Sequence, residues 1–244
     1  MPKSRNVLEE VIARLKAVYG RPAPPAVVDP LELILLENVA YLVGDEQREK
    51  AFEALRERIG TTPESILSAP DAALLEVARL GGINARQRAQ RLQLIARIAL
   101  EEFEGDLRWA LKQPLAQARK SLKLFPAIGD PGAEKILLFS RSHRVLALDS
   151  NGLRVLVRLG FGEERKNYAA TYRSAQDAIR DYLRDDYGWL IRAHQLLRRH
   201  GQELCRRSQP VCAACSLTDF CRFYQVGRVS HRPGTGGRAR QPRA

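Results

Sequence analysis

A turn between two apolar helical segments is encoded by the stretch LFPAIGDPGAEKILLF at residues 124–139. The turn has a Pro-x-x-Gly pattern over 126–129. We expect the second helix to begin with Asp130 as its N-cap and Pro131 at its first position. Exposed amides at such a turn can bind a phosphate, especially where glycine lets the backbone approach closely. The alternative is an ordinary connection between two packed helices.

Helical periodicity extends from this turn in both directions. Apolar residues recur at three- and four-residue steps over 8–18, 31–35 and 52–59. Further helical segments are expected at 70–79, 86–102, 114–123, 132–141, 151–159, 173–183 and 187–199. Short stretches rich in Gly, Pro, Asn and Asp separate these segments, and the sequence has no clear strand alternation. The sequence therefore predicts an all-α fold with short connections.

The chain has a large positive charge. Its 244 residues include 40 Lys and Arg against 28 Asp and Glu, which gives a net charge of +12. Such a surplus favours a polyanionic partner, because each neutralised phosphate releases condensed counterions. Residues 227–244 are rich in Gly, Arg and Pro and are expected to form a disordered basic tail. This tail is either a solvated terminus or a nonspecific phosphate-binding arm.

Two absences bear on localisation. No apolar run approaches the ~20 residues that a membrane-spanning helix needs. The first residues, MPKSRNVLEE, lack the apolar core of a signal peptide. We therefore expect a cytoplasmic protein with no membrane partner.

All four cysteines lie in one short segment, Cys205-x6-Cys212-x2-Cys215-x5-Cys221. Disulfides are disfavoured in a reducing cytoplasm. Structural zinc sites usually have two short cysteine pairs separated by a longer span, whereas this segment has only one short pair. A compact loop with four thiolates suits a [4Fe–4S] cluster, and zinc is the alternative.

The cysteine segment resembles the C-terminal cluster loop of the endonuclease III family of DNA glycosylases, which has the same 6-2-5 spacing. The preceding LLRRHG at residues 196–201 resembles the lead-in to that loop. The turn at 125–129 resembles the family's hairpin, Leu-Pro-Gly-x-Gly, with Ala127 replacing the first glycine. The resemblance implies a [4Fe–4S] cluster with a structural role. It also implies DNA contacts from the hairpin residues Pro126, Ala127, Ile128 and Gly129.

A third motif, ALDSNGLRVLVRLG at 147–160, resembles the family's Val-Asp-Thr-His-x-x-Arg-Val segment. Asp149 stands at the position of the family's catalytic aspartate, and Asn151 replaces the histidine. A carboxylate beside the sugar stabilises the developing oxocarbenium ion or activates water during cleavage of an N-glycosidic bond. The alternative for Asp149 is a plain helix N-cap.

Further departures from the family pattern affect the lysine position and the loops expected to contact DNA. Pro131 stands where bifunctional members have the lysine that forms a Schiff base. Lys135 lies about 6 Å further along the helix and is expected to be a solvated side chain. The turn at 81–86 resembles the family's wedge loop, so Ile83 is a candidate wedge, with burial in the core as the alternative. Asn38 is a candidate for the residue that fills the gap left by an extruded base.

The resemblance implies two helical domains that flank a DNA-binding cleft. We expect a monomeric, nucleoid-associated monofunctional DNA glycosylase of base excision repair, acting on double-stranded DNA with a damaged or mismatched base. The alternatives are a catalytically silent DNA-binding protein and a bifunctional glycosylase/lyase with an unrecognised amine. The expected divisions are an N-terminal helix packing with the cluster domain (1–28), a helical barrel domain ending in the hairpin (29–136), the domain of Asp149 and the cluster (137–226), and the tail (227–244).

Overall fold

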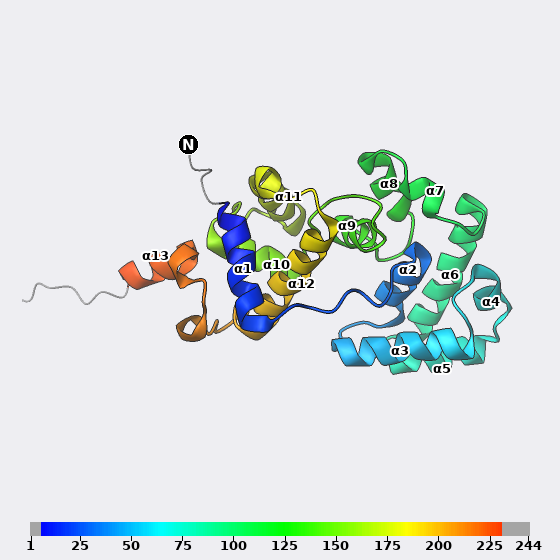
Figure 1. Ribbon diagram of the computed structural model, residues 1–244. Coiled ribbons are helices and arrows are strands. Elements are labelled where there is room, and N and C mark those ends of the chain that lie inside the picture. The colour runs from blue at the N-terminus through cyan, green and yellow to red at the C-terminus, as the bar shows by residue number, and fades with distance from the viewer. Residues whose placement is uncertain (1–5, 231–244) are drawn as a thin grey trace, which may run out of the picture. The chain divides into compact units, whose positions relative to one another are not determined.

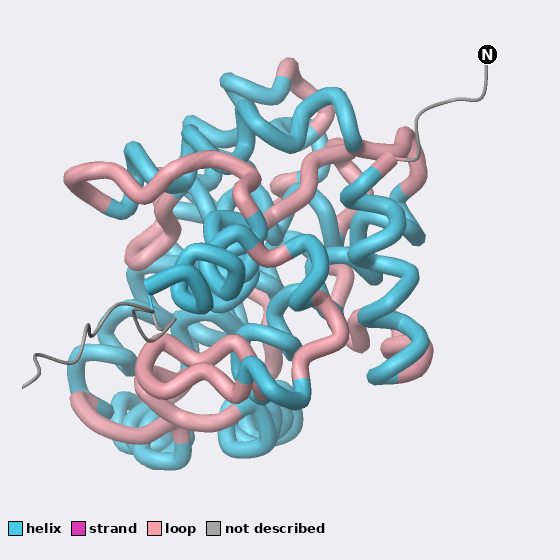
Figure 2. Tube along the Cα trace, turned by 90° about the vertical axis from the view of Figure 1, so that its left-hand side faces the viewer, coloured by secondary structure: helices cyan, strands magenta, loops and turns pink. Residues whose placement is uncertain are grey.

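The computed structural model describes residues 6–230, which form thirteen α-helices and three short 3₁₀ turns (Figures 1 and 2). The helices are α1 (Val7–Tyr19), α2 (Pro30–Val39), α3 (Asp45–Arg58), α4 (Pro63–Ser68), α5 (Asp71–Leu80), α6 (Ala85–Phe103), α7 (Arg108–Leu111), α8 (Leu115–Leu122), α9 (Asp130–Phe139), α10 (Ser150–Leu159), α11 (Tyr168–Ile179), α12 (Tyr187–Glu203) and α13 (Arg222–Ser230). Over these residues there is no strand, which confirms the all-α prediction. Within residues 6–230, no helix is both long and apolar enough to cross a membrane.

The chain divides into two packing units. The first consists of the described parts of Met1–Gly20, Ser150–Tyr182 and Leu196–Ala244. The second consists of Arg21–Asp149 and Leu183–Gln195. This division differs from the expected one, because residues 21–28, 137–149 and 183–195 pack in the unit that contains the hairpin.

Helix α6 is the centre of the second unit. It packs against α2, α4 and α5, and α3 lies along α2 and α5 (Figure 1). The face of α6 that makes these contacts consists of apolar residues at three- and four-residue spacing, so its burial follows from the sequence period. The buried residues of this face include Leu92, Ile95, Ala96, Ala99 and Phe103.

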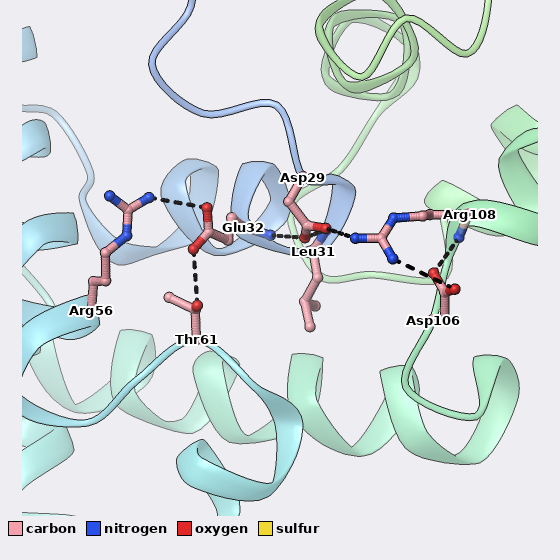
Figure 3. A network of polar contacts seen from close by, with 7 residues as sticks. All are labelled: Asp29, Leu31, Glu32, Arg56, Thr61, Asp106 and Arg108. Atoms are coloured by element: carbon pink, nitrogen blue, oxygen red, sulfur yellow. Dashed lines mark hydrogen bonds and ion pairs between the residues drawn. The ribbon is translucent and has the colours of Figure 1, made fainter.

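A polar network fixes the start of α2 (Figure 3). The N-cap Asp29 accepts hydrogen bonds from the amides of Leu31 and Glu32 at 3.0 and 3.2 Å and pairs with Arg108 at 3.1 Å. Glu32 in turn accepts hydrogen bonds from Arg56 and Thr61. These contacts fasten α2 to neighbouring segments at its first turn, so its last turn has a fixed place next to the hairpin.

The first unit contains α10, which packs against α11 and α13. Helix α1 buries an apolar stripe, Leu8, Val11, Ile12 and Leu15, and contacts the 3₁₀ turn Arg180–Tyr182. Helix α11 begins at Tyr168, five residues before the expected segment at 173–183. Helix α13 extends to Ser230, so the first four residues of the expected disordered tail are helical, and the remainder lies outside the described residues.

Candidate functional site

The hairpin joins α8 to α9 and is anchored by apolar side chains. Phe125 is buried and stacks on Phe103, with ring centroids 5.6 Å apart, and Ile128 is buried as well. Ala127 has φ 59°, a left-handed conformation that favours glycine, which is the residue the family has at this position. The N-cap of α9 is Gly129, so the expectation that Asp130 caps this helix is wrong by one position. Asp130 pairs instead with Lys123 at 2.8 Å.

Asn38, at the end of α2, holds the hairpin from the other side. Its Nδ2 donates to the carbonyls of Ile34 and Pro126 at 3.0 and 3.1 Å. The residue is only 2% exposed. A side chain that fills a gap in DNA must project from the surface, so this burial does not suit the gap-filling role expected for Asn38. The observed contacts make it a support for the hairpin backbone.

Lys135, one turn into α9, is ion-paired rather than solvated. Its Nζ lies 2.6 Å from Oε1 of Glu37, and these two side chains are only 25% and 23% exposed. Arg48 approaches the other Glu37 oxygen at 3.9 Å. Burial opposes ionisation of Glu37, but the Lys135 and Arg48 cations bring the pKa of this carboxyl below its ordinary value. The pair ties α2 to α9 behind the hairpin.

Two neighbouring loops present exposed apolar side chains. Leu42 is 76% exposed at φ 55°, and Ile83 is 55% exposed, so the alternative that Ile83 belongs to the core is wrong. The Tyr41 amide donates to the Gly81 carbonyl at 2.9 Å, which joins the loops in a parallel bridge. The buried Arg88 guanidinium donates to the carbonyls of Val39, Ala78 and Gly82. These bonds hold the two loops together and fix the backbone from which Leu42 and Ile83 project.

Asp149 is half-buried and directly precedes α10. The three residues before it, Leu146, Ala147 and Leu148, are buried. Nδ1 of the buried His194 donates to the Ala147 carbonyl at 2.8 Å, and the His194 ring packs edge-on against Phe139. The backbone leading to the carboxylate is therefore fixed, which suits a group that must keep one position beside a substrate.

The four cysteines line one cavity in the first unit, together with apolar side chains such as Val155, Leu204 and Leu217. Burial raises the pKa of the Cys215 and Cys221 thiols, and the neighbouring cysteines raise it further. Four thiols that line one cavity form the donor set of a metal or cluster site. Over residues 6–230, no group of three or more His, Cys, Asp and Glu side chains has the geometry to hold a single metal ion.

Arginines hold the cysteine loop, residues 205–221, through backbone carbonyls of the loop and of the end of α12. Arg154 donates to Cys205 and Gly201 at 2.8 and 2.7 Å. Arg158 donates to the carbonyls of Arg206 and Arg207 and also lies 3.4 Å from Sγ of Cys205. From α1, Arg14 reaches the Ser216 carbonyl at 3.2 Å, so the N-terminal helix also supports the loop.

A buried histidine lies next to the loop. His200 is 2% exposed, and burial lowers its pKa to about 4. Its Nδ1 lies 3.0 Å from the Tyr19 hydroxyl, and its Nε2 lies 3.5 Å from Sγ of Cys215. Burial also raises the pKa of Tyr19 to about 12. At neutral pH the histidine is therefore uncharged and the phenol keeps its proton.

Comparison with known proteins finds relatives and structural neighbours among the endonuclease III proteins. No protein-family model matches the chain. Endonuclease III of Thermotoga maritima is 27% identical over 207 residues, 84% of this chain and 89% of that protein. Endonuclease III of Sulfolobus acidocaldarius is 28% identical over 181 residues, 71% of this chain and 73% of that protein. A trapped endonuclease III–DNA covalent intermediate has the same fold, with a TM-score of 0.71 at 18% identity over 92% of this chain and 99% of that one.

The chain is similar to endonuclease III over most of its length and shares its all-α fold. This similarity confirms the resemblance inferred from the three motifs. Sequence reasoning nevertheless missed several residues of the candidate site, namely Leu42, Arg88, Arg154, Arg158 and His200. Arg154 occupies the arginine position of the aspartate motif, and His200 lies in the segment before the first cysteine. The motifs could therefore have identified both residues. Arg88 gave no such signal, because an arginine on a charged helix is expected from the sequence to be exposed.

Proposed function

We propose that the protein is a monofunctional DNA glycosylase of base excision repair that hydrolyses the N-glycosidic bond of a damaged or mismatched base. The observation that supports this most directly is the fixed Asp149, which follows a buried segment and directly precedes α10. Similarity to endonuclease III supports the reaction class. The structural neighbour in complex with DNA supports a duplex as the partner.

In the proposed reaction Asp149 is the catalytic carboxylate. As the bond between C1′ and the base breaks, its electron pair leaves with the base and positive charge develops on the sugar. An ionised carboxylate stabilises this charge and accepts a proton from the attacking water. The products are the free base and an abasic site on an intact strand.

Two observations support hydrolysis without strand cleavage. Pro131, at the position of the family's Schiff-base lysine, has no nucleophilic side chain. The next amine along α9, on Lys135, is engaged by Glu37 at 2.6 Å. An amine held in this ion pair behind the hairpin is not free to attack the sugar.

DNA contacts are proposed for the hairpin and for the two joined loops. The backbone at 126–129 and the start of α9 offer amides to a phosphate, as in other helix N-termini. The projections Leu42 and Ile83 enter the duplex and take the space of the extruded base. Leu42 replaces Asn38 in this role because Asn38 is buried against the hairpin.

The cysteine loop is proposed to bind a [4Fe–4S] cluster with Cys205, Cys212, Cys215 and Cys221 as ligands. The donor set fits, because four thiols line one cavity and each iron of the cluster takes one thiolate. Nearby arginines offset the negative charge of such a group. The role we propose is structural: the cluster holds a basic loop in shape beside the phosphates.

The test is a panel of duplexes, each with one uracil, mismatched thymine, alkylated purine or oxidised pyrimidine, and alkali cleavage to reveal base release. We expect release from one class, and a loss of about 100- to 1,000-fold in Asp149→Asn with duplex affinity retained. Asp181→Asn, which removes an exposed acid, is the matched control. Unchanged release in Asp149→Asn would exclude the carboxylate assignment. Binding without release from any duplex would identify a catalytically silent protein.

Borohydride trapping tests the absence of lyase chemistry. Reduction cross-links a protein to DNA only when a Schiff base has formed, so an endonuclease III treated in parallel is the positive control. We expect no cross-link with this protein on a duplex from which it releases the base. A cross-link that persists in Lys135→Ala would show that another amine attacks the sugar.

A further inference from the structure

Among the groups around the cysteine cavity, His200 has an unusual combination of contacts. It lies on α12, is almost fully buried, and contacts a phenol with one ring nitrogen and a cysteine sulfur with the other. The ring of Tyr19 packs edge-on against that of His200, with centroids 6.0 Å apart. The imidazole therefore links the last residue of α1 to Cys215.

The hydrogen-bond directions follow from the chemistry of the three groups. A cysteine sulfur that binds iron is a thiolate and can only accept a hydrogen bond, so Nε2 of His200, 3.5 Å from Cys215 Sγ, must carry the ring proton to bond it. Sulfur hydrogen bonds are longer than oxygen ones, which fits this distance. With the proton on Nε2, Nδ1 accepts from the Tyr19 hydroxyl at 3.0 Å. The Tyr19 hydroxyl thus supports the tautomer that donates to the sulfur.

Tyr19 and the part of α12 that carries His200 are fixed by other contacts. Arg199 donates to the Tyr19 carbonyl at 3.2 Å and lies 4.8 Å from the centroid of its ring. On the other side, a side chain at Gly201 would lie only 2.6 Å from the Asn151 carbonyl, so glycine lets α12 approach α10 closely. The imidazole is therefore positioned by the fold and does not depend on the loop.

Cys215 differs from Cys205 in its donor. Cys205 faces the cationic Arg158 guanidinium at 3.4 Å, whereas Cys215 receives a hydrogen bond from the Leu217 amide at 3.4 Å and lies 3.5 Å from Nε2 of His200. The loop thus has one ligand beside a cation and one that is held by a histidine.

We propose that His200 is a positioning residue for the cofactor: its Nε2–H donates to the Cys215 thiolate, retains that ligand and raises the reduction potential of the bound cluster. The potential rises because a donor favours the reduced cluster, which has the greater negative charge. This inference rests on the proposed [4Fe–4S] cofactor. It adds a residue outside the cysteine motif to the groups that control that cofactor.

The test uses the full-length iron-loaded protein and electrode voltammetry. His200→Phe keeps a ring of similar size and removes the donor. At a fixed potential we expect its oxidised-to-reduced ratio to rise about tenfold, equivalent to about 59 mV for a one-electron couple. His200→Gln retains an N–H donor and is expected to restore most of the wild-type ratio. Visible absorbance in the presence of a chelator should decay faster in His200→Phe than in wild type.

A second substitution keeps the proposal testable if His200→Phe fails to fold. Tyr19→Phe removes the hydroxyl that supports the donating tautomer, and we expect a shift in the same direction but smaller. Tyr182→Phe, at a partly exposed tyrosine in the same unit, is the control and should leave the ratio unchanged. A full iron content with less than a twofold change in both the His200 and Tyr19 variants would overturn the role of His200. Wild-type protein without iron would instead overturn the cofactor proposal and this inference with it.

Discussion

The hairpin and the cysteine loop, residues 205–221, are held in shape by different means. Phe125 and Ile128 bury the hairpin in the core of its unit, and Asn38 adds one hydrogen bond from α2. The cysteine loop has two 3₁₀ turns, Cys212–Ala214 and Thr218–Phe220, and contributes little apolar surface to a core apart from Leu217. Arginine side chains and, in our proposal, iron–sulfur bonds replace that core. The comparison predicts that the hairpin keeps its shape as protein alone, whereas the loop depends on the proposed cofactor.

Removal of iron should produce the largest effect and should separate the two regions. We expect amide hydrogen exchange in 205–221 to accelerate by about 100-fold or more when a chelator strips the cluster, because metal binding and local folding are coupled. Exchange at 123–129 should change by less than twofold. Hydrogen-exchange mass spectrometry of the loaded and stripped protein measures both segments in one experiment. Equal acceleration in both would contradict the distinction drawn here.

The sequence predicted the two regions unequally well. Four cysteines within one short segment identify the loop without any knowledge of the fold. In long amphipathic helices such as α6, the apolar spacing predicts which residues are buried. Helices α4 and α7 were missed because six and four residues are too few for a periodic signal. The support of the hairpin by Asn38 was also missed, since this contact joins residues 88 positions apart.

The same limit explains what was missed around the cysteines. His200 stands beside the motif, but its contact with Tyr19 spans 181 positions and depends on how α1 packs. Lys135 was expected to be solvated because nothing in its own segment indicates Glu37 as a partner. Spacing within a segment is readable from sequence, whereas the partner of a buried polar group depends on tertiary packing.

An intermediate effect is expected from breaking the ion pair behind the hairpin. Glu37→Gln should lower the free energy of unfolding by about 2 kcal/mol at pH 7, because it removes a charge-assisted hydrogen bond at a mostly buried site. Since folding lowers the pKa of Glu37, the contribution is present above the ordinary pKa of about 4.3 and is lost as the pH falls through the lowered value. Denaturant titrations of both proteins at pH 7 and near pH 3 measure this difference.

The control for this ion pair is Glu46→Gln on α3. Glu46 pairs with Lys50 at 2.7 Å, but both side chains are well exposed, so no measurable change is expected. Exchange in the cysteine loop should remain at its wild-type rate in Glu37→Gln, since the pair lies in the other unit. A loss of stability that does not depend on pH would show that the pair acts through packing and not through charge.

The smallest effect concerns Ala127 and has the opposite sign. At φ 59° the backbone of Ala127 is strained, because its Cβ crowds the following carbonyl oxygen. Glycine relieves this strain but makes the unfolded chain more flexible. The net effect of Ala127→Gly should be a stabilisation of roughly 0.5–1 kcal/mol. Ala116→Gly, at an exposed position within α8, should destabilise it by a similar amount, because there the backbone is helical. Glycine at 127 also lets a phosphate approach the hairpin amides, so we expect tighter binding to duplex DNA in a titration at fixed salt. Equal destabilisation by both glycines would mean that the hairpin backbone is relaxed with alanine, and that its shape comes from Phe125 and Asn38 alone.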